Sequence, residues 1–245
     1  MPRRVRSARV RGRKIGFVGW SDWIRDRVEV EPSLYAADFT RLGAQIEALL
    51  GGGCRIFHFD IGDGHFVPPV TIGPVVLRSI APMIHAAGAV VDCHLMVTDP
   101  EHHFEEIAQS GGDGITFHVE VTDDPAGVAA AARAFGLAVG VSFNPGTGPE
   151  TAAAFAAEAG AEIVLCMSIN PGYSGQAFMP EAFDRVARIA ELVDVPIQVD
   201  GGIGAANARV VRAAGASLLV AGSAVFADPD PAAAYRRIAA AALIA

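Results

Sequence analysis

The sequence has few cysteines, few aromatic residues and only one lysine among its 245 residues. Cys54, Cys93 and Cys166 are odd in number and not spaced as zinc ligands, so we expect reduced thiols packed in the interior. The lysine, Lys14, lies near the start, which argues against aldolases and decarboxylases that use an active-site lysine. No apolar run approaches the roughly 20 residues of a membrane span and no secretory signal is visible, which favours a cytoplasmic protein.

Basic residues are also scarce outside the first stretch of the chain. Residues 1–14 hold seven of the 19 basic residues, which leaves 12 against all 27 acidic residues. This acidic remainder argues against nucleic-acid binding, because neutralising phosphates needs a basic surface. We predict that residues 1–27 form a basic, partly disordered N-terminal extension and that residues 28–245 form one domain. The apolar stretch around Trp20 and Trp23 leaves open a short element that caps this domain.

Short apolar runs alternate with alanine-rich amphipathic runs from about Val28 to the end of the chain. The pattern contains eight strand–helix units, and the strands are too uniformly apolar for a sheet with one exposed face. Eight such units in roughly 215 residues predict an α/β protein with the (β/α)8 TIM-barrel fold. A doubly wound open sheet is the rival, but the turn after the first strand reads "SLYAADF" where that fold favours GxGxxG.

Polar side chains occur at the predicted carboxyl ends of several strands, where the active site of such a barrel lies. His58 and Asp60 share one face of the second strand, and Asp92 and His94 share one face of the third. Asp200 ends the seventh strand. Two imidazoles and at least two of these three carboxylates at one mouth predict a divalent-metal site for zinc, iron, manganese or cobalt. A hydrogen-bonded polar network without a metal is the alternative.

Glycine-rich turns follow the last three predicted strands. "VDGGIGAANA" and "VAGSAVF" each lead from a strand through glycines into a helix, which favours phosphate binding by backbone N–H groups. The loop "NPGYSGQAF", residues 170–178, follows the sixth strand and has the length and glycine content of a lid.

These motifs, in order and spacing, resemble those of the ribulose-phosphate 3-epimerase family over residues 28–230. They are "PSLYAADF", "HFDIGDGHFVP", "DCHLMV", "TFHVE", "MSINPGYSGQAF", "VDGG" and "VAGSAVF". The resemblance implies that His58, Asp60, His94 and Asp200 bind the metal and that Asp60 and Asp200 are the acid/base pair. The implied substrate-binding residues are Ser33, His94, Met96, Met167, Gly172, Gly175, Gly201, Gly202, Gly222 and Ser223.

The resemblance further implies an isomerase that epimerises C3 of a ketose phosphate, converting D-ribulose 5-phosphate to D-xylulose 5-phosphate as in the pentose phosphate pathway. Two bases would move the proton through a metal-stabilised cis-enediolate. Gly62 departs from the family pattern, which has methionine there, and it suggests room for a six-carbon substrate such as allulose 6-phosphate. A non-catalytic sugar-phosphate-binding paralogue is the other alternative.

Partners and supporting residues complete the expectations. The resemblance implies a sugar phosphate as the small-molecule ligand and a homo-oligomeric assembly, and nothing indicates a membrane partner. His118 and Glu120 end the fourth strand and are expected to support the site from behind, while Asp92 is expected either to orient a ligand histidine or to lie in a polar layer inside the barrel. Asp63 and His65 lie in the loop after the second strand, where shaping the loop and contacting the substrate are equally open roles.

Overall fold

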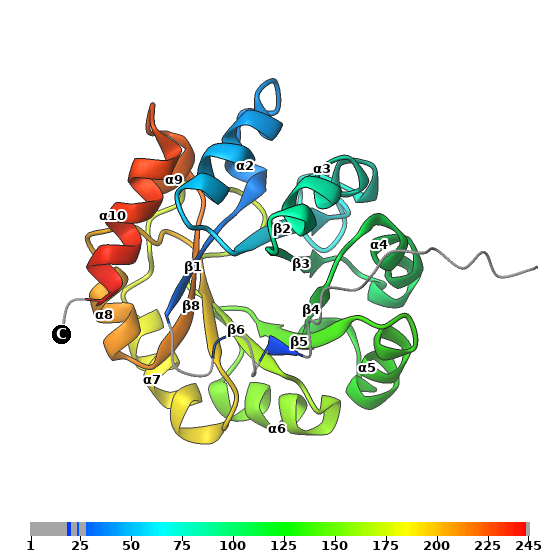
Figure 1. Cartoon of the computed structure of the whole chain (residues 1–245). Helices are drawn as coiled ribbons and strands as arrows, with labels where there is room; N and C mark the ends of the chain where they lie inside the picture. Colours follow the sequence, from blue (N-terminus) through cyan, green and yellow to red (C-terminus); the bar gives the residue numbers. More distant parts are fainter. Residues whose placement is uncertain (1–18, 21–23, 25–27, 244–245) are drawn as a thin grey trace, which may run out of the picture.

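The computed structural model of the chain describes residues 19–20, 24 and 28–243, and in it eight parallel strands form a barrel surrounded by helices (Figure 1). The strands pair in the order β1-β8-β7-β6-β5-β4-β3-β2, and a parallel bridge between Ser33 and His58 joins the two ends. This confirms the predicted (β/α)8 barrel. The strands are β1 Glu29–Pro32, β2 Ile56–Gly62, β3 Val90–Met96, β4 Gly114–His118, β5 Ala138–Phe143, β6 Ile163–Met167, β7 Ile197–Asp200 and β8 Ala216–Ala221.

Helices follow the strands and cover the outside of the barrel (Figure 1). Several begin with proline, whose fixed φ and missing N–H suit the first helical turn. The α-helices are α2 Leu42–Gly51, α3 Pro74–Ala86, α4 Phe104–Ser110, α5 Pro125–Ala134, α6 Pro149–Ala159, α7 Ala182–Leu192, α8 Ala208–Ala213, α9 Ser223–Phe226 and α10 Pro231–Leu243. Short 3-10 helices lie at η1 Leu34–Ala36, η2 Pro100–His103 and η3 Val119–Val121.

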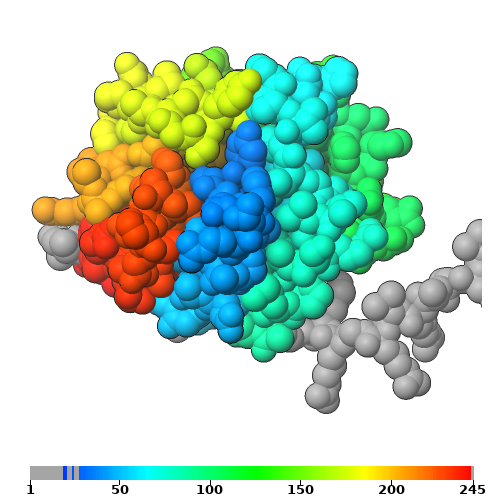
Figure 2. Space-filling view, turned by 90° about the horizontal axis from the view of Figure 1, so that it is seen from above, coloured from blue at the N-terminus to red at the C-terminus, as the bar shows by residue number. Residues whose placement is uncertain are grey.

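The first and last helices of the described chain close the outer layer. In Figure 2 the blue segment that contains α2 lies directly beside the red segment that contains α10. No helix in the described ranges is long and apolar enough to cross a membrane.

The two faces of each strand have different roles, as the alternation of β2 shows. Phe57, Phe59 and Ile61 point outward into the main hydrophobic core between barrel and helices. His58 and Asp60 alternate with them and therefore point into the barrel, because successive strand residues face opposite sides. The alternation therefore places the polar side chains of β2 in the interior of the barrel, although every residue of this strand is buried.

A separate apolar cluster fills the amino-terminal end of the barrel, opposite the predicted site. Trp20 is fully buried and Ile24 nearly so, and both pack with residues near the strand beginnings, namely Ile56, Val90, Ala138, Ile163 and Leu218. The backbone N–H of Trp20 donates to Glu162 Oε2 at 3.2 Å. Trp20 therefore caps the domain, which was the arrangement left open, while the basic residues 1–14 and Trp23 lie outside the described residues.

Candidate active site

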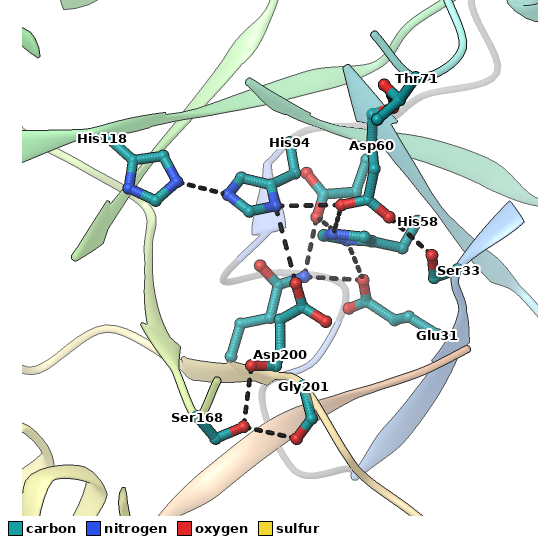
Figure 3. A network of polar contacts seen from close by, with 12 residues as sticks. Glu31, Ser33, His58, Asp60, Thr71, His94, His118, Ser168, Asp200 and Gly201 are labelled. Carbon is teal, nitrogen blue, oxygen red and sulfur yellow. Dashed lines mark hydrogen bonds and ion pairs between the residues drawn. The ribbon is translucent and has the colours of Figure 1, made fainter. Parts of the chain in front are cut away.

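His58, Asp60, His94 and Asp200 converge inside the barrel (Figure 3). His58 Nε2 lies 3.2 Å from Asp60 Oδ1, and His94 Nδ1 lies 3.1 Å from the same oxygen. Asp200 Oδ2 is 3.8 Å from His94 Nδ1. One ligand atom from each side chain lies within 4.8 Å of all the others. The sheet enforces this proximity, because Asp60 pairs in register with His94 on the neighbouring strand.

The chemistry of this cluster fits a divalent cation. Two imidazole nitrogens and two carboxylate oxygens form a donor set that suits zinc, iron, manganese or cobalt. His58 Nε2 is buried and makes no hydrogen bond within the described part of the chain, although it faces the cluster. Its one close polar neighbour among the described residues is Asp60 Oδ1 at 3.2 Å, and a cation bound between the two atoms would contact both.

The two aspartates differ in their affinity for a proton. Burial by itself raises the pKa of Asp60, but the adjacent His58 and His94 outweigh it and hold that pKa well below its usual range. Burial, reinforced by the negative charge of Asp60, raises the pKa of Asp200 to about 6. Two nearby carboxyls with separated pKa values are the arrangement that acid and base catalysis requires.

Hydrogen bonds fix the position of Asp60. The Ser33 hydroxyl donates to Asp60 Oδ2 at 2.6 Å, which leaves Oδ1 for the two histidines. Thr71 Oγ1 donates to the backbone oxygen of Asp60 at 2.7 Å and accepts the N–H of Gly62 at 2.6 Å. Thr71, in the segment after β2, therefore fixes the backbone at Asp60 and Gly62, and with it the position of the Asp60 carboxylate.

A second polar layer lies beneath the cluster and consists of Glu31, Asp92 and Gln198, all fully buried. Gln198 Nε2 donates to Glu31 Oε2 at 2.7 Å and to Asp92 Oδ2 at 2.8 Å. Asp92 Oδ2 lies 3.2 Å from His58 Nδ1, so it orients a histidine of the cluster, as expected. Burial raises the pKa of Glu31 to about 7. Glu31 is not among the site residues predicted from the sequence. Its place in the alternating run "VEVEP" is the pattern that could have indicated an inward-facing carboxylate.

His118 lies behind His94, on the side away from Asp60 (Figure 3), and Glu120 contacts His118. His118 Nε2 is 2.9 Å from His94 Nε2, and His118 Nδ1 is 3.2 Å from Glu120 Oε2. Burial is the main reason that the pKa of His118 falls to about 4, so this ring is neutral near pH 7. The expected support from β4 is therefore present, and it reaches His94 directly.

A cavity adjoins the cluster. Asp60 and Asp200 form part of its wall, together with Tyr35 and Ser174. Of the residues predicted to contact substrate, all but the fully buried His94 line it: Ser33, Met96, Met167, Gly172, Gly175, Gly201, Gly202, Gly222 and Ser223. Among the described residues of this wall there is no lysine or arginine, so backbone N–H groups and hydroxyls are the available donors for an anion.

The second glycine after β7, Gly202, lies so close to the loop that follows β6 that a side chain would not fit there. Gly202 has φ of 62°, and a Cβ on it would lie 2.5 Å from the backbone nitrogen of Phe178. Ser168 Oγ reaches the same turn, with Asp200 O at 2.8 Å and Gly201 O at 2.6 Å. Within the loop, Gln176 Nε2 donates to the backbone carbonyl oxygens of Asn170 and Tyr173. The predicted lid is therefore packed against the strand end that carries Asp200.

Gly62 does not enlarge this cavity, which corrects the expectation drawn from it. A Cβ on Gly62 would lie 2.9 Å from Val67 Cγ2, 3.0 Å from Pro69 O and 3.1 Å from Thr71 Cγ2. The segment after β2 folds over the glycine, and Gly62 is not part of the cavity wall. The space that a larger side chain would take is already occupied. Of the two roles left open for Asp63 and His65, the contacts favour shaping this segment: Asp63 accepts N–H groups of His65 and Phe66, each at 2.8 Å.

Fold and site together define a class: a (β/α)8-barrel protein with a candidate metal cluster at the carboxyl ends of its strands, beside a small-molecule cavity. Solved structures support the fold. A 3-hexulose-6-phosphate synthase shares a TM-score of 0.65 at 23% identity, covering 88% of this chain and 99% of that one. A tryptophan synthase structure from Mycobacterium tuberculosis gives 0.68 at 21% identity, covering 91% and 96%.

The chain belongs to the ribulose-phosphate 3 epimerase family, whose family model matches residues 29–226. The "Ribulose-phosphate 3-epimerase, cytoplasmic isoform" of Oryza sativa is 39% identical over 206 residues, 83% of this chain and 89% of the relative. The ribulose-phosphate 3-epimerases of Mycobacterium bovis and Escherichia coli are 38% and 35% identical, covering 84% and 82% of this chain and 89% and 90% of the relatives. The resemblance inferred from the motif series is confirmed.

Proposed function

We propose that this protein is an isomerase that epimerises C3 of a ketose phosphate, interconverting D-ribulose 5-phosphate and D-xylulose 5-phosphate. The observation that carries the proposal is that Asp60 and Asp200, from two different strands, share one cluster and line one cavity. Family membership and the printed names of the relatives supply the substrate class.

The reaction requires a proton to leave one face of C3 and another to arrive on the opposite face. Asp60 and Asp200 both line the cavity, so one carboxylate can remove the proton while the other carboxyl group delivers one. The roles exchange when the reaction runs in reverse. A divalent cation held by His58, Asp60, His94 and Asp200 would stabilise the negative charge that develops on the substrate oxygens.

The glycine-lined end of the cavity is proposed to hold the phosphate. Gly175, Gly202, Gly222 and Ser223 line the same cavity as the two aspartates, so a substrate bound there would have its other end near the acid/base pair. Fixing the unreactive end of a substrate limits which carbon meets the catalytic groups. The main argument for a six-carbon substrate was free space beside Gly62, and this space is filled.

The cation is proposed to be zinc, iron, manganese or cobalt, since nitrogen and oxygen donors in this number suit all four. We also propose a homo-oligomer and a cytoplasmic location. The resemblance supports the first, and the name of the rice relative supports the second. A sugar-phosphate-binding protein without activity is the competing possibility.

The test is proton exchange in the purified, metal-loaded protein. Incubation with D-ribulose 5-phosphate in D2O should place deuterium at C3 and yield D-xylulose 5-phosphate, whereas a binding protein would do neither. Asp60→Asn and Asp200→Asn should reduce turnover by several orders of magnitude, with metal content measured in each to separate loss of the base from loss of the ligand. Asp113→Asn, which changes a carboxylate beside His85 on the helical shell, is the matched control. Turnover near the wild-type value in either active-site variant would refute the two-base assignment.

A further inference from the structure

We propose that His118 and Glu120 are positioning residues that fix the tautomer and direction of His94, so that His94 Nδ1 is presented to the cation cluster. The inference rests on the proposed cation site, and it assigns a role to two side chains that do not line the substrate cavity. Three side chains form a continuous line from the cluster to the partly exposed Glu120: His94, His118 and Glu120. Figure 3 shows the first contact, between His94 and His118.

The direction of each hydrogen bond follows from the outermost group. The Glu120 carboxylate only accepts hydrogen bonds, so the hydrogen between Glu120 Oε2 and His118 Nδ1 belongs to the histidine. A neutral His118 then has a bare Nε2, which can only accept. The nitrogen facing it at 2.9 Å is His94 Nε2, which must therefore carry the hydrogen.

With the ring hydrogen on Nε2, the other nitrogen of His94, Nδ1, carries a lone pair and faces the cluster. His94 Nδ1 lies 3.1 Å from Asp60 Oδ1 and 3.8 Å from Asp200 Oδ2, so it is the nitrogen that could bind a cation. Without His118 as an acceptor, His94 could place its hydrogen on Nδ1 and present a donor to the cluster instead. The carboxylate at the end of the chain also increases the basicity of the ring that binds the metal.

The outer end of the line is itself fixed. Glu120 Oε1 accepts the backbone N–H of Asn144 at 2.9 Å and the Thr147 hydroxyl, both from the loop after β5. The Phe66 ring packs on His118 with ring centroids 4.6 Å apart. His118 is fully buried, whereas the Glu120 side chain is 26% exposed. A substitution at Glu120 therefore tests the line with less risk to folding than one at His118.

The experiment measures cation affinity and the protonation pattern of His94 in full-length protein. Zn²⁺ affinity is determined by competition with a chromophoric chelator for wild type, His118→Phe and Glu120→Gln. In Glu120→Gln the side-chain NH2 group must face either His118 or the donors of Asn144 and Thr147. An NH2 group cannot accept a hydrogen bond, so the contact on that side is lost. Nitrogen-15 NMR of the zinc-loaded protein reports which nitrogen of His94 carries hydrogen.

Another histidine–carboxylate pair in the chain supplies the control. His85 Nε2 lies 2.9 Å from Asp113 Oδ2, and neither residue belongs to the cluster or the cavity wall. His85→Phe and Asp113→Asn should therefore lower stability without changing Zn²⁺ affinity. Thermal unfolding of each metal-free variant records the structural cost separately.

We expect Zn²⁺ affinity to fall about 10- to 100-fold in His118→Phe and Glu120→Gln, the range typical for outer ligands of metal-bound histidines. We also expect the His94 Nε2–H signal to be lost or shifted in both variants, with neither change in the controls. Wild-type Zn²⁺ affinity and an unchanged His94 signal in Glu120→Gln would overturn the inference while leaving the proposed function intact. A wild-type protein that binds no Zn²⁺ and has no epimerase activity would overturn both.

Discussion

Removing the Trp20 side chain is expected to destabilise the barrel from the end opposite the site. Trp20 is fully buried and packs beneath the strand beginnings, with its indole ring about 3 Å from where a Cβ on Gly114 would lie. The substitution Trp20→Ala leaves this space empty, and the residues around it include β-branched side chains held by strands that cannot easily collapse inward.

The magnitude follows from the area involved. A tryptophan buries up to about 250 Å², which at about 25 cal/mol per Å² gives an upper limit near 6 kcal/mol. Measured Trp→Ala costs are about 3–5 kcal/mol, and we take the lower value of about 3 kcal/mol. For a chain of this size each kcal/mol lowers the Tm by about 2–4 °C, so the expected fall is about 6–12 °C.

Far-UV circular dichroism during thermal and urea unfolding measures this effect. Trp20→Phe, which keeps much of the apolar contact, should lose less stability, and Phe135→Ala, at a residue that is 44% exposed, should change stability by less than about 0.5 kcal/mol. A Trp20→Ala protein with wild-type Tm would show that the Trp20 side chain contributes nothing to the stability of the barrel.

Three further predictions concern the site and its surroundings. Gly62→Ala should lower the free energy of unfolding by about 1–3 kcal/mol through overpacking against Val67, which a lower urea midpoint would show. The preference between five- and six-carbon substrates should be the same in both proteins. If the wild type used the six-carbon substrate better than Gly62→Ala does, the space beside Gly62 would not be filled. Asp63 is partly buried, which alone raises its pKa, but N–H donors led by that of Thr98 lower the pKa to about 2 from an ordinary 3.8. Its carboxylate therefore stabilises the fold above pH 3.8 and loses this contribution as the pH falls toward 2, so Asp63→Asn should flatten the acid branch of urea midpoint against pH; an unaltered branch would refute this. Chelation should abolish activity reversibly, and re-addition of cation at about 100 times its Kd should raise the unfolding free energy by about 2.7 kcal/mol; equal stability with and without cation would argue against the cluster.

The fold was accessible from the sequence because it depends on patterns within short windows. Apolar strands of four to seven residues alternate with amphipathic helices, and the starts of several helices are marked by proline. Strand ends then locate the site, since parallel strands in a barrel deliver their carboxyl ends to one mouth. His58, Asp60, His94 and Asp200 could be grouped on that basis before any distance was known.

What the sequence could not provide depended on contacts between distant segments. The filling of the space beside Gly62 is set by how residues 67–71 fold back, which no strand pattern encodes. The burial of Trp20 depends on a gap at the strand beginnings. Glu31 looked like one more charge in a short strand, and only the register with β8 and the position of Gln198 place it under the cluster.

The placement of the four candidate ligands on strand residues and strand ends has a consequence for ion capture. Their side chains lose conformational freedom when the barrel forms, so little ordering entropy remains to be lost when an ion arrives. Ions of different radius would meet an opening of nearly constant size, and discrimination among them would come from fit to that opening instead of from rearrangement of the chain.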